Sequence, residues 1–305
     1  MLRIALSVLT VLAGIYALWM AAVPVMNIKW EVSQAQRAGI EVALPEGGIR
    51  TASSFGLLKD NLHLVAGTYL QDKPRLPAPA QVFTELWETT VQKKVTSKRS
   101  LVFHASVTLS ATLLGFAIGA ALGLMLAVGI VHLRVLDASV MPWAIASQTI
   151  PIIAIAPMVI VVLNSVGITG LLPKAIISAY LSFFPVVVGM VKGLRSPDAM
   201  QMDLLRTYSA TPWQTFWKLR LPAALPFLFP SLKVGIAAAL VGTIVAELPS
   251  GAVSGLGARL LGGSYYGQTI QIWSALFAAA IVAAGLVGLV SLLQAAVLRR
   301  MGMAR

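Results

Sequence analysis

The chain has 305 residues, of which 58% are hydrophobic and only 11% are charged, and its mean hydropathy is +0.84. A soluble domain carries roughly 25% charged residues, so this chain lacks the polar side chains that would cover a water-soluble globule. A soluble enzyme and a disordered protein are therefore excluded as first interpretations. The net charge of +12 is spread over loops between apolar runs, which indicates membrane orientation rather than a nucleic-acid partner. The absence of cysteine excludes disulfides, thiolate metal sites and a cysteine nucleophile.

Six apolar runs are long enough to cross a bilayer, for which a helix needs about 20 residues. The runs are residues 4–23, 105–131, 139–163, 171–191, 223–246 and 272–298. The first run follows Arg3 and resembles a signal peptide, but its apolar stretch is longer than the 7–15 residues of a secretory core, so an uncleaved helix is favoured. We expect an all-α integral membrane protein with six transmembrane helices, joined between the third and fourth by a short turn.

Lysine and arginine residues in the short loops predict the orientation of these helices. With the N-terminus inside, the short outside loops hold only Lys174 and Arg259. The inside segments then hold ten basic residues: Arg3, Arg134, Lys192, Arg195, Arg206, Lys218, Arg220, Arg299, Arg300 and Arg305. Both termini and the segment between the fourth and fifth helices are therefore expected to face the cytoplasm, in a multi-pass protein.

The spans and loops predict four parts of the chain. They are an N-terminal transmembrane helix (1–23), an external insertion (24–100), a core of five transmembrane helices (101–298) and a cytoplasmic tail (299–305). The insertion contains two amphipathic stretches, 54–69 and 81–91, with apolar residues at helical spacing. They either contact an external partner or brace the bundle as interfacial helices.

Several kinds of chemistry are absent from the sequence. It has no Walker A loop, no metal-ligand spacing around its three histidines and no G-x-S-x-G motif. Glu247 alone among the carboxylates lies near a span, whereas a proton-driven carrier usually places ionisable groups within the membrane. We therefore expect no cofactor, metal site or catalytic residue in this chain, and energy supplied by another chain. A self-sufficient secondary carrier or a membrane-embedded enzyme remains the alternative.

The segment 196–222, between the fourth and fifth spans, has the pattern of two short helices. Ser196 is the expected N-cap of the first, because a proline and an aspartate follow it and both suit a first helical turn.

The second short helix begins with a capping box, in which Thr211 caps the helix and Gln214 follows three residues later. The break between the two helices must therefore lie at Ser209–Ala210. A rigid helix-turn-helix of this kind is suited to pass the movement of a soluble partner to the neighbouring spans.

The same segment resembles the permease subunits of binding-protein-dependent ABC importers. Their loop has the pattern Glu-Ala-Ala, three residues, Gly, nine residues, Ile-x-Leu-Pro. The corresponding positions in this chain are Asp203, Leu204, Leu205, Ser209 and residues 219–222. The spacing matches at each step, while Asp replaces Glu, Leu-Leu replaces the Ala pair and Ser replaces Gly. The resemblance implies that the residues that couple the chain to an ATPase are Asp203, Leu204, Leu205, Arg206, Ser209, Ala210 and Thr211.

The resemblance covers about residues 77–298 and is closest to the nitrate/sulfonate/taurine branch, which includes permeases for thiamine-pyrimidine and riboflavin precursors. The matching segments are 76–79, 106–109, 115–116, 148–151, 156–157, 246–247 and 255–257. Residues 24–76 have no counterpart in that family.

What the resemblance implies is a type I ABC importer permease in a bacterial inner membrane. Two permease subunits, identical or paralogous, would surround the path of a small solute such as a sulfonate, nitrate or a heterocycle. Two cytoplasmic ATPase subunits would bind ATP and Mg, and a periplasmic binding protein would deliver the solute. The permease itself would have no enzymatic activity.

The expected substrate path combines polar residues and helix-breaking prolines. Gln148, Thr149 and Asn164 are the polar residues of the third span, and Pro151 weakens its backbone hydrogen bonding, either to open a path or only to kink the helix. Lys233 and Glu247 complete the candidate set. Glu247 is expected foremost as a cap or gate, with substrate binding and pairing with Lys233 or Arg259 as alternatives.

The second span carries Gly115, Gly119 and Gly123 at four-residue intervals, a spacing that lets helix backbones approach closely. This seam is expected either to pack within the chain or to pair two subunits.

Overall fold

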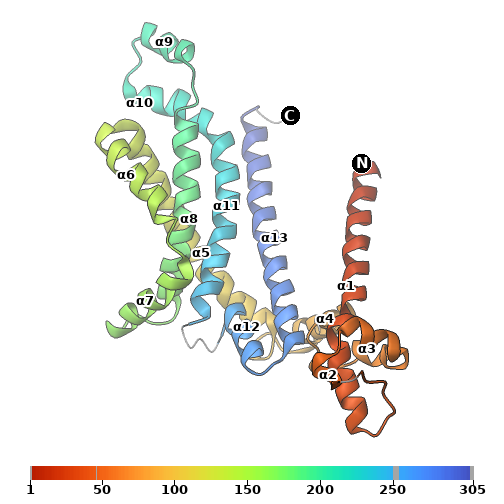
Figure 1. Cartoon of the computed structure of the whole chain (residues 1–305). Helices are drawn as coiled ribbons and strands as arrows, with labels where there is room; N and C mark the ends of the chain where they lie inside the picture. Colours follow the sequence, from red (N-terminus) through yellow and green to blue (C-terminus); the bar gives the residue numbers. More distant parts are fainter. Residues whose placement is uncertain (1, 46, 250–253, 303–305) are drawn as a thin grey trace. The chain divides into compact units, whose positions relative to one another are not determined.

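The computed structural model describes residues 2–45, 47–249 and 254–302, and the regular structure in these ranges is helical throughout (Figure 1). The all-α fold is therefore confirmed. The chain forms two compact units, of which the first comprises Met1–Val102 with Arg259–Ala278 and the second Phe103–Ala258 with Ala279–Arg305. Residues 303–305, which complete the expected tail and include Arg305, lie outside the described residues.

Five helices in the described ranges are long and apolar enough to cross a membrane. They are α1 (Leu2–Arg37), α5 (Leu101–His132), α8 (Leu171–Leu194), α11 (Leu221–Glu247) and α13 (Thr269–Arg300). The third expected span is wrong as a single helix, because α6 (Arg134–Ser147) and α7 (Ile152–Ser165) meet at 99°. Pro151 has φ −62° and ψ 120°, and a proline also disfavours the helical conformation of the residue before it, so the helix ends there. If α6 and α7 together are counted as one broken span, the described residues contain six spans.

In the first unit, α1 continues well past the expected end of its span at residue 23, and its second half carries a buried polar anchor. The Asn27 side chain is fully buried and donates to the carbonyls of Thr68 (3.0 Å) and Leu76 (2.8 Å). Its Oδ1 accepts from the backbone N–H groups of Arg75 (2.9 Å) and Leu76 (3.1 Å). Because this one side chain uses its hydrogen-bonding capacity on residues 68–76, that irregular segment is fixed along α1.

The first amphipathic stretch, expected over 54–69, is not one helix. The structure divides it into α3 (Ser54–Asp60), η1 (Leu62–Leu64) and η2 (Ala66–Tyr69), following the short helix α2 (Gly48–Thr51). The break lies at Asn61, whose buried side chain donates to the carbonyl of Ala43 and accepts from its N–H. These hydrogen bonds between the Asn61 side chain and the backbone of Ala43 form where the helix would otherwise continue. The second stretch forms α4 (Pro79–Trp87), followed by a π-helical turn, η3 (Glu88–Gln92).

The centre of the second unit is the pair α8 and α11, which buries a cluster of aliphatic side chains. The buried members of the cluster from these two helices are Val186, Val187, Met190, Val191, Leu194, Ala224 and Leu228. Ser178 of α8 donates to the carbonyl of Ala239 of α11 at 2.9 Å, so the two backbones lie close together.

The glycine seam of α5 packs inside the chain, against α8. A Cβ on Gly115 would lie 2.5 Å from the carbonyl oxygen of Ala175, and one on Gly119 would lie 2.7 Å from that of Ala179. Since such distances leave no room for a side chain, this surface of α5 is closed by α8 and is not free to pair two subunits.

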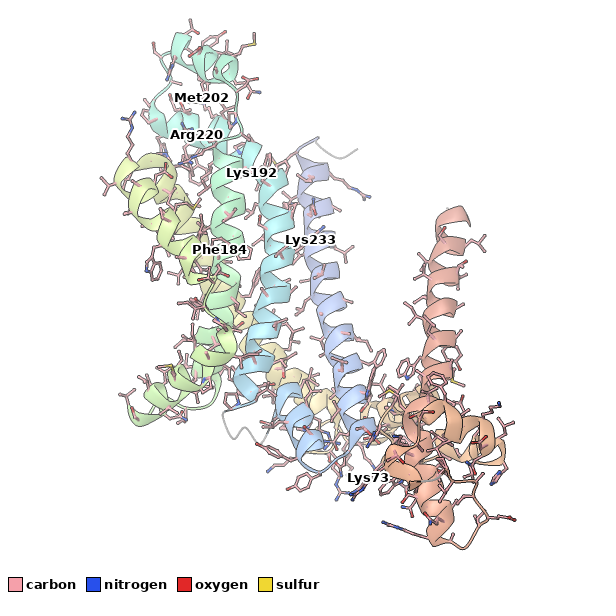
Figure 2. All side chains as sticks on the ribbon, viewed as in Figure 1. Lys73, Phe184, Lys192, Met202, Arg220 and Lys233 are labelled. Atoms are coloured by element: carbon pink, nitrogen blue, oxygen red, sulfur yellow. The ribbon has the colours of Figure 1, made fainter. Side chains whose placement is uncertain are left out.

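Two short helices project from the end of α8 and lead into α11 (Figure 1). They are α9 (Ala199–Thr207) and α10 (Pro212–Thr215), and the π-helical turn η4 (Phe216–Arg220) joins the second to α11. Figure 2 shows Lys192, Met202 and Arg220 at this end of the second unit. The helix-turn-helix expected between the fourth and fifth spans is therefore present.

Candidate functional site

The first candidate site is the α9–α10 loop, whose first helix begins two residues later than expected. Asp198, not Ser196, is the N-cap, because its Oδ1 accepts from the backbone N–H of Gln201 at 2.7 Å. The Gln201 side chain in turn accepts from the N–H of Asp198 at 3.3 Å. This reciprocal pair satisfies two backbone donors, which a cap at Ser196 does not. Ser196 instead donates to the carbonyl of Ala223 at 3.4 Å.

The break between the helices lies at Ser209, as the sequence predicts. Ser209 has φ +53° and is the single non-glycine residue with positive φ in the described ranges. The N–H of Ser209 donates to the carbonyl of Arg206 (2.9 Å) and the N–H of Ala210 to that of Leu205 (3.0 Å). This is the Schellman geometry that ends many helices, with a residue in the left-handed conformation where glycine is usual.

The second helix starts with the expected capping box. The N–H of Gln214 donates to the Oγ1 of Thr211 at 3.2 Å, and the N–H of Thr211 donates to the Oε1 of Gln214 at 2.9 Å. Local hydrogen bonds therefore fix both sides of the turn between α9 and α10, and the loop is a defined elbow rather than a flexible link.

One face of α9 carries large apolar side chains that no described residue covers. Met200, Leu204 and Tyr208 are 80%, 57% and 77% exposed, and their spacing of four residues places them along one side of the helix. Trp213 of α10 is 69% exposed. An exposed apolar stripe on a short helix outside the spans is typical of a helix that lies in a partner's groove.

The remaining coupling candidates surround this face. Asp203 and Arg206 are exposed and form an ion pair of 2.9 Å along α9. Leu205 and Ala210 are half-buried, and Thr211 is exposed. The structure thus brings the candidates into one elbow, while Met200, Tyr208 and Trp213 were missed by the family pattern. The available signal in the sequence was the four-residue spacing of Met200, Leu204 and Tyr208 in an otherwise polar segment.

The second candidate site is a buried polar cluster at the end of α11. Glu247 is fully buried, and its Oε1 accepts from Lys174 Nζ of α8 at 3.3 Å. Thr108 Oγ1 of α5 lies 3.0 Å from both carboxylate oxygens. The Oε2 also accepts from the N–H of Gly257 at 2.8 Å. One carboxylate therefore joins three transmembrane helices to the segment that follows α11.

The segment after α11 is fixed to α5 by two further bonds. Leu256 donates its N–H to Thr108 Oγ1 at 2.8 Å, and Gly255 donates its N–H to Nδ1 of the buried His104 at 3.0 Å. These residues begin α12 (Leu256–Tyr265). The segment is thereby held against the bundle by backbone as well as by side-chain contacts.

The two glycines of this segment are required by the cluster. Gly255 has φ +124°, and a Cβ there would lie 2.1 Å from Glu247 Oε1. A Cβ on Gly257 would lie 2.4 Å from the carbonyl of Ile244. The sequence therefore contained a signal for this site, an isolated glutamate followed by Gly-Leu-Gly. It gave no sign that Lys174, Thr108 and His104 complete the cluster.

The path candidates occupy different places in the second unit. Gln148 lies at the bend between α6 and α7, where its Nε2 is buried and has no hydrogen-bond partner among the described residues. Thr149 and Pro151 at the same bend, and Asn164 near the other end of α7, are exposed. Lys233 is half-buried about midway along α11 (Figure 2). The structure thus brings the bend residues together, but it does not gather the six candidates into one pocket.

The bend itself is supported from α8. Tyr180 donates its hydroxyl to the carbonyl of Ser147 at 2.5 Å, which satisfies a backbone acceptor where the helix ends. Ala156 and Ile160 of α7 pack in a cluster with Ile177 of α8 and Ala246 of α11. Helix α7 therefore packs beside Ala246, the residue that precedes Glu247.

Arg259, an alternative partner for Glu247 at the sequence level, instead lies 4.0 Å from Glu85 within the first unit. Burial lowers the pKa of Arg259, an effect that the Glu85 charge opposes and the Arg99 charge reinforces. In the described ranges, no three side chains of the metal-ligating types gather closely enough to hold an ion.

We expect that Glu247→Ala lowers the free energy of unfolding by roughly 3–5 kcal/mol, because it leaves the Lys174 ammonium buried without its carboxylate. The double change Glu247→Met with Lys174→Met removes both charges and should recover most of that loss. Denaturant unfolding in detergent micelles measures each value. The exposed pair Asp203→Ala with Arg206→Ala is the control and should cost less than about 1 kcal/mol. A Glu247→Ala cost no larger than that of the control contradicts a stabilising cluster.

Ser209→Gly should stabilise the elbow by about 1 kcal/mol, because glycine adopts positive φ without the Cβ penalty. Amide hydrogen exchange at residues 209 and 210 should slow accordingly. Thr207→Gly is the matched control, because glycine within the helix costs about 1 kcal/mol and should speed exchange. If both glycine variants speed exchange alike, the strain at Ser209 is not relieved by glycine.

Comparison with known proteins agrees with this geometry. Residues 119–303, more than half of the chain, match the family of binding-protein-dependent transport system inner membrane components. The riboflavin transport system permease protein RibX of Chloroflexus aurantiacus is 32% identical over 64% of this chain and 69% of its own length.

Two further relatives have other solutes in their names. The formylaminopyrimidine transport permease protein ThiX of Halalkalibacterium halodurans is 31% identical over 60% of this chain and 68% of its own length. The putative aliphatic sulfonates transport permease protein SsuC of Bacillus subtilis is 27% identical over 62% of this chain and 67% of its own length. The chain therefore belongs to the binding-protein-dependent transport system inner membrane components, as a multi-pass permease subunit of an ABC importer that is not itself an enzyme.

Proposed function

We propose that this permease is driven through its α9–α10 elbow, which lies in a groove of a cytoplasmic ATPase subunit. The observation that carries the proposal is the exposed apolar face of Met200, Leu204 and Tyr208 on a helix outside the spans. The capping boxes and the Schellman turn support a rigid elbow, so displacement of α9 is passed to α8 and α11. ATP and Mg are bound by the ATPase, since the chain has no Walker A loop.

The same proposal includes the orientation and the other partners. The N- and C-termini and the elbow face the cytoplasm of a bacterial inner membrane, in agreement with the ten basic residues on that side. A second permease subunit, an identical copy or a paralogue, completes the path. A periplasmic binding protein delivers the solute to the side of residues 24–100.

The proposed substrate is a small solute, a vitamin-precursor heterocycle or an oxyanion such as a sulfonate or nitrate. The names of the relatives support this class. The buried amide of Gln148, which no described residue accepts from, offers a donor to a carbonyl or oxyanion oxygen, and Lys233 supplies a positive charge in α11. Thr149, Pro151 and Asn164 line the same path in this proposal. Both oxygens of Glu247 are engaged within the chain, which supports a gate role rather than contact with substrate.

Leu204→Ser and Tyr208→Ser should each weaken binding of the cognate ATPase subunit at least about tenfold, because buried apolar anchors dominate such contacts. Pull-down titration measures binding, and ATP-driven uptake in proteoliposomes measures coupling. Val135→Ser removes a 76% exposed apolar side chain from the first turn of α6 and serves as the control. Unchanged binding and uptake in both elbow variants exclude this docking face, and uptake by the permease alone supports a self-sufficient carrier.

The orientation is tested with single cysteines, because the natural chain has none. Thr207→Cys, on α9, should react with a membrane-impermeant maleimide only after right-side-out vesicles are opened. Asp72→Cys, in the segment 24–100, should react in intact vesicles. The reverse pattern contradicts the proposed orientation and with it the cytoplasmic elbow.

A further inference from the structure

The first unit carries a pair of apolar grooves beside α4 that its described residues leave open. One has a volume of about 430 Å³ and is lined by residues of α1, α4 and α13, among them Tyr16, Trp19, Phe83 and Phe277. The other, of about 520 Å³, shares Tyr16 and Ala80 with the first. The first groove has a firm wall, because Trp19 stacks on Phe277 with ring centroids 5.8 Å apart.

The surroundings of these grooves are those of a membrane interface. The α1 residues before Trp19 are strongly exposed although they are apolar, as in Leu9 (63%) and Ile15 (56%). Phe83 and Trp87 of α4 are 65% and 52% exposed and continue this apolar surface away from α1. A short amphipathic helix with outward aromatic residues next to a lipid-facing span is typical of a helix that lies in the headgroup region.

A basic segment follows η3, the π-helical turn that continues α4. Residues 93–99 contain Lys93, Lys94, Lys98 and Arg99 and no acidic residue. The side chains of Lys93 and Lys94 are exposed, and they follow the end of η3 by one and two residues. Lys93 ends the helix, and a rise of about 1.5 Å per residue places it roughly 10 Å beyond Leu86 of the first groove, within the reach of a phospholipid headgroup. Glu85 and Glu88 precede these lysines in the chain, and Glu85 lies 4.0 Å from Arg259, so the four basic residues of 93–99 leave this end of the grooves positive, which favours an anionic headgroup.

We propose that the two grooves hold the acyl chains of one anionic phospholipid whose phosphate lies against Lys93 and Lys94. The two apolar grooves, which share Tyr16 and Ala80, correspond to the two chains of a diacyl lipid. The exposed lysines would bind the negative charge of the headgroup, and the exposed aromatic residues of α4 would lie at the same level in the bilayer as that headgroup. This lipid site belongs to the first unit alone and does not depend on ATPase coupling or on the transported solute.

The test uses the full chain in phosphatidylcholine vesicles that contain one-fifth phosphatidylglycerol. A bimane fluorophore on Phe83→Cys reports the groove, and the natural chain contributes no other thiol. Brominated phosphatidylglycerol should quench it more strongly than brominated phosphatidylcholine. Lys93→Gln with Lys94→Gln should reduce that preference by about fivefold or more, as expected for each surface lysine on an anionic bilayer. The control, Arg50→Gln with Lys59→Gln, removes two exposed positive charges from α2 and α3 and should leave the preference unchanged.

Bimane on Phe55→Cys, a 73% exposed position of α3, should not be quenched by either lipid. Native mass spectrometry of the unlabelled chain provides a second reading, in which the retained phosphatidylglycerol should fall in the Lys93/Lys94 variant only. Equal quenching by both lipids overturns the anionic headgroup. No quenching at position 83, the result expected if a second permease copy covers the grooves, overturns the lipid site.

Discussion

The permease core depends on the pairing of a buried charge at the place where its helices end. A carboxylate removed from water inside a membrane protein is unfavourable unless a cation and hydrogen-bond donors surround it. Glu247 meets that requirement with Lys174, Thr108 and the N–H of Gly257, which come from two other helices and from the segment that follows. The cluster also explains why residues 255 and 257 are glycines, since neither position has space for a side chain.

Away from this cluster, the helices of the core are held together by close approach of their backbones. Lipid chains are as apolar as the helix surfaces, so helices in a membrane associate through tight packing and polar contacts rather than through exclusion of water. The glycine seam of α5 lets that helix touch the backbone of α8, and Ser178 bonds across to α11. The polar cluster then fixes the register of three helices that already lie close together.

Much of this architecture could be predicted from sequence because its causes are local. The apolar runs located the helices, and Thr211 with Gln214 located a helix start from a spacing of three residues. Other features depend on residues far apart in the chain. The partner of Glu247 is 73 residues away, and the 99° bend at Pro151 is an angle that no spacing encodes. The cap at Asp198 was missed for another reason, since two polar residues on either side of Pro197 both qualified and the Gln201 side chain decided between them.

The π-helical turn η4 joins the elbow to α11. A π turn holds about one residue more than an α turn, so an exchange of its hydrogen bonds for α bonds would change the rotation and the length of the helix. Such an exchange over Phe216–Arg220 would turn α10 about the α11 axis by about 100° and shift it along that axis by roughly 1.5 Å, without breaking the helix. The junction can therefore act as a swivel, so a push on the elbow can appear in the bundle as rotation instead of translation.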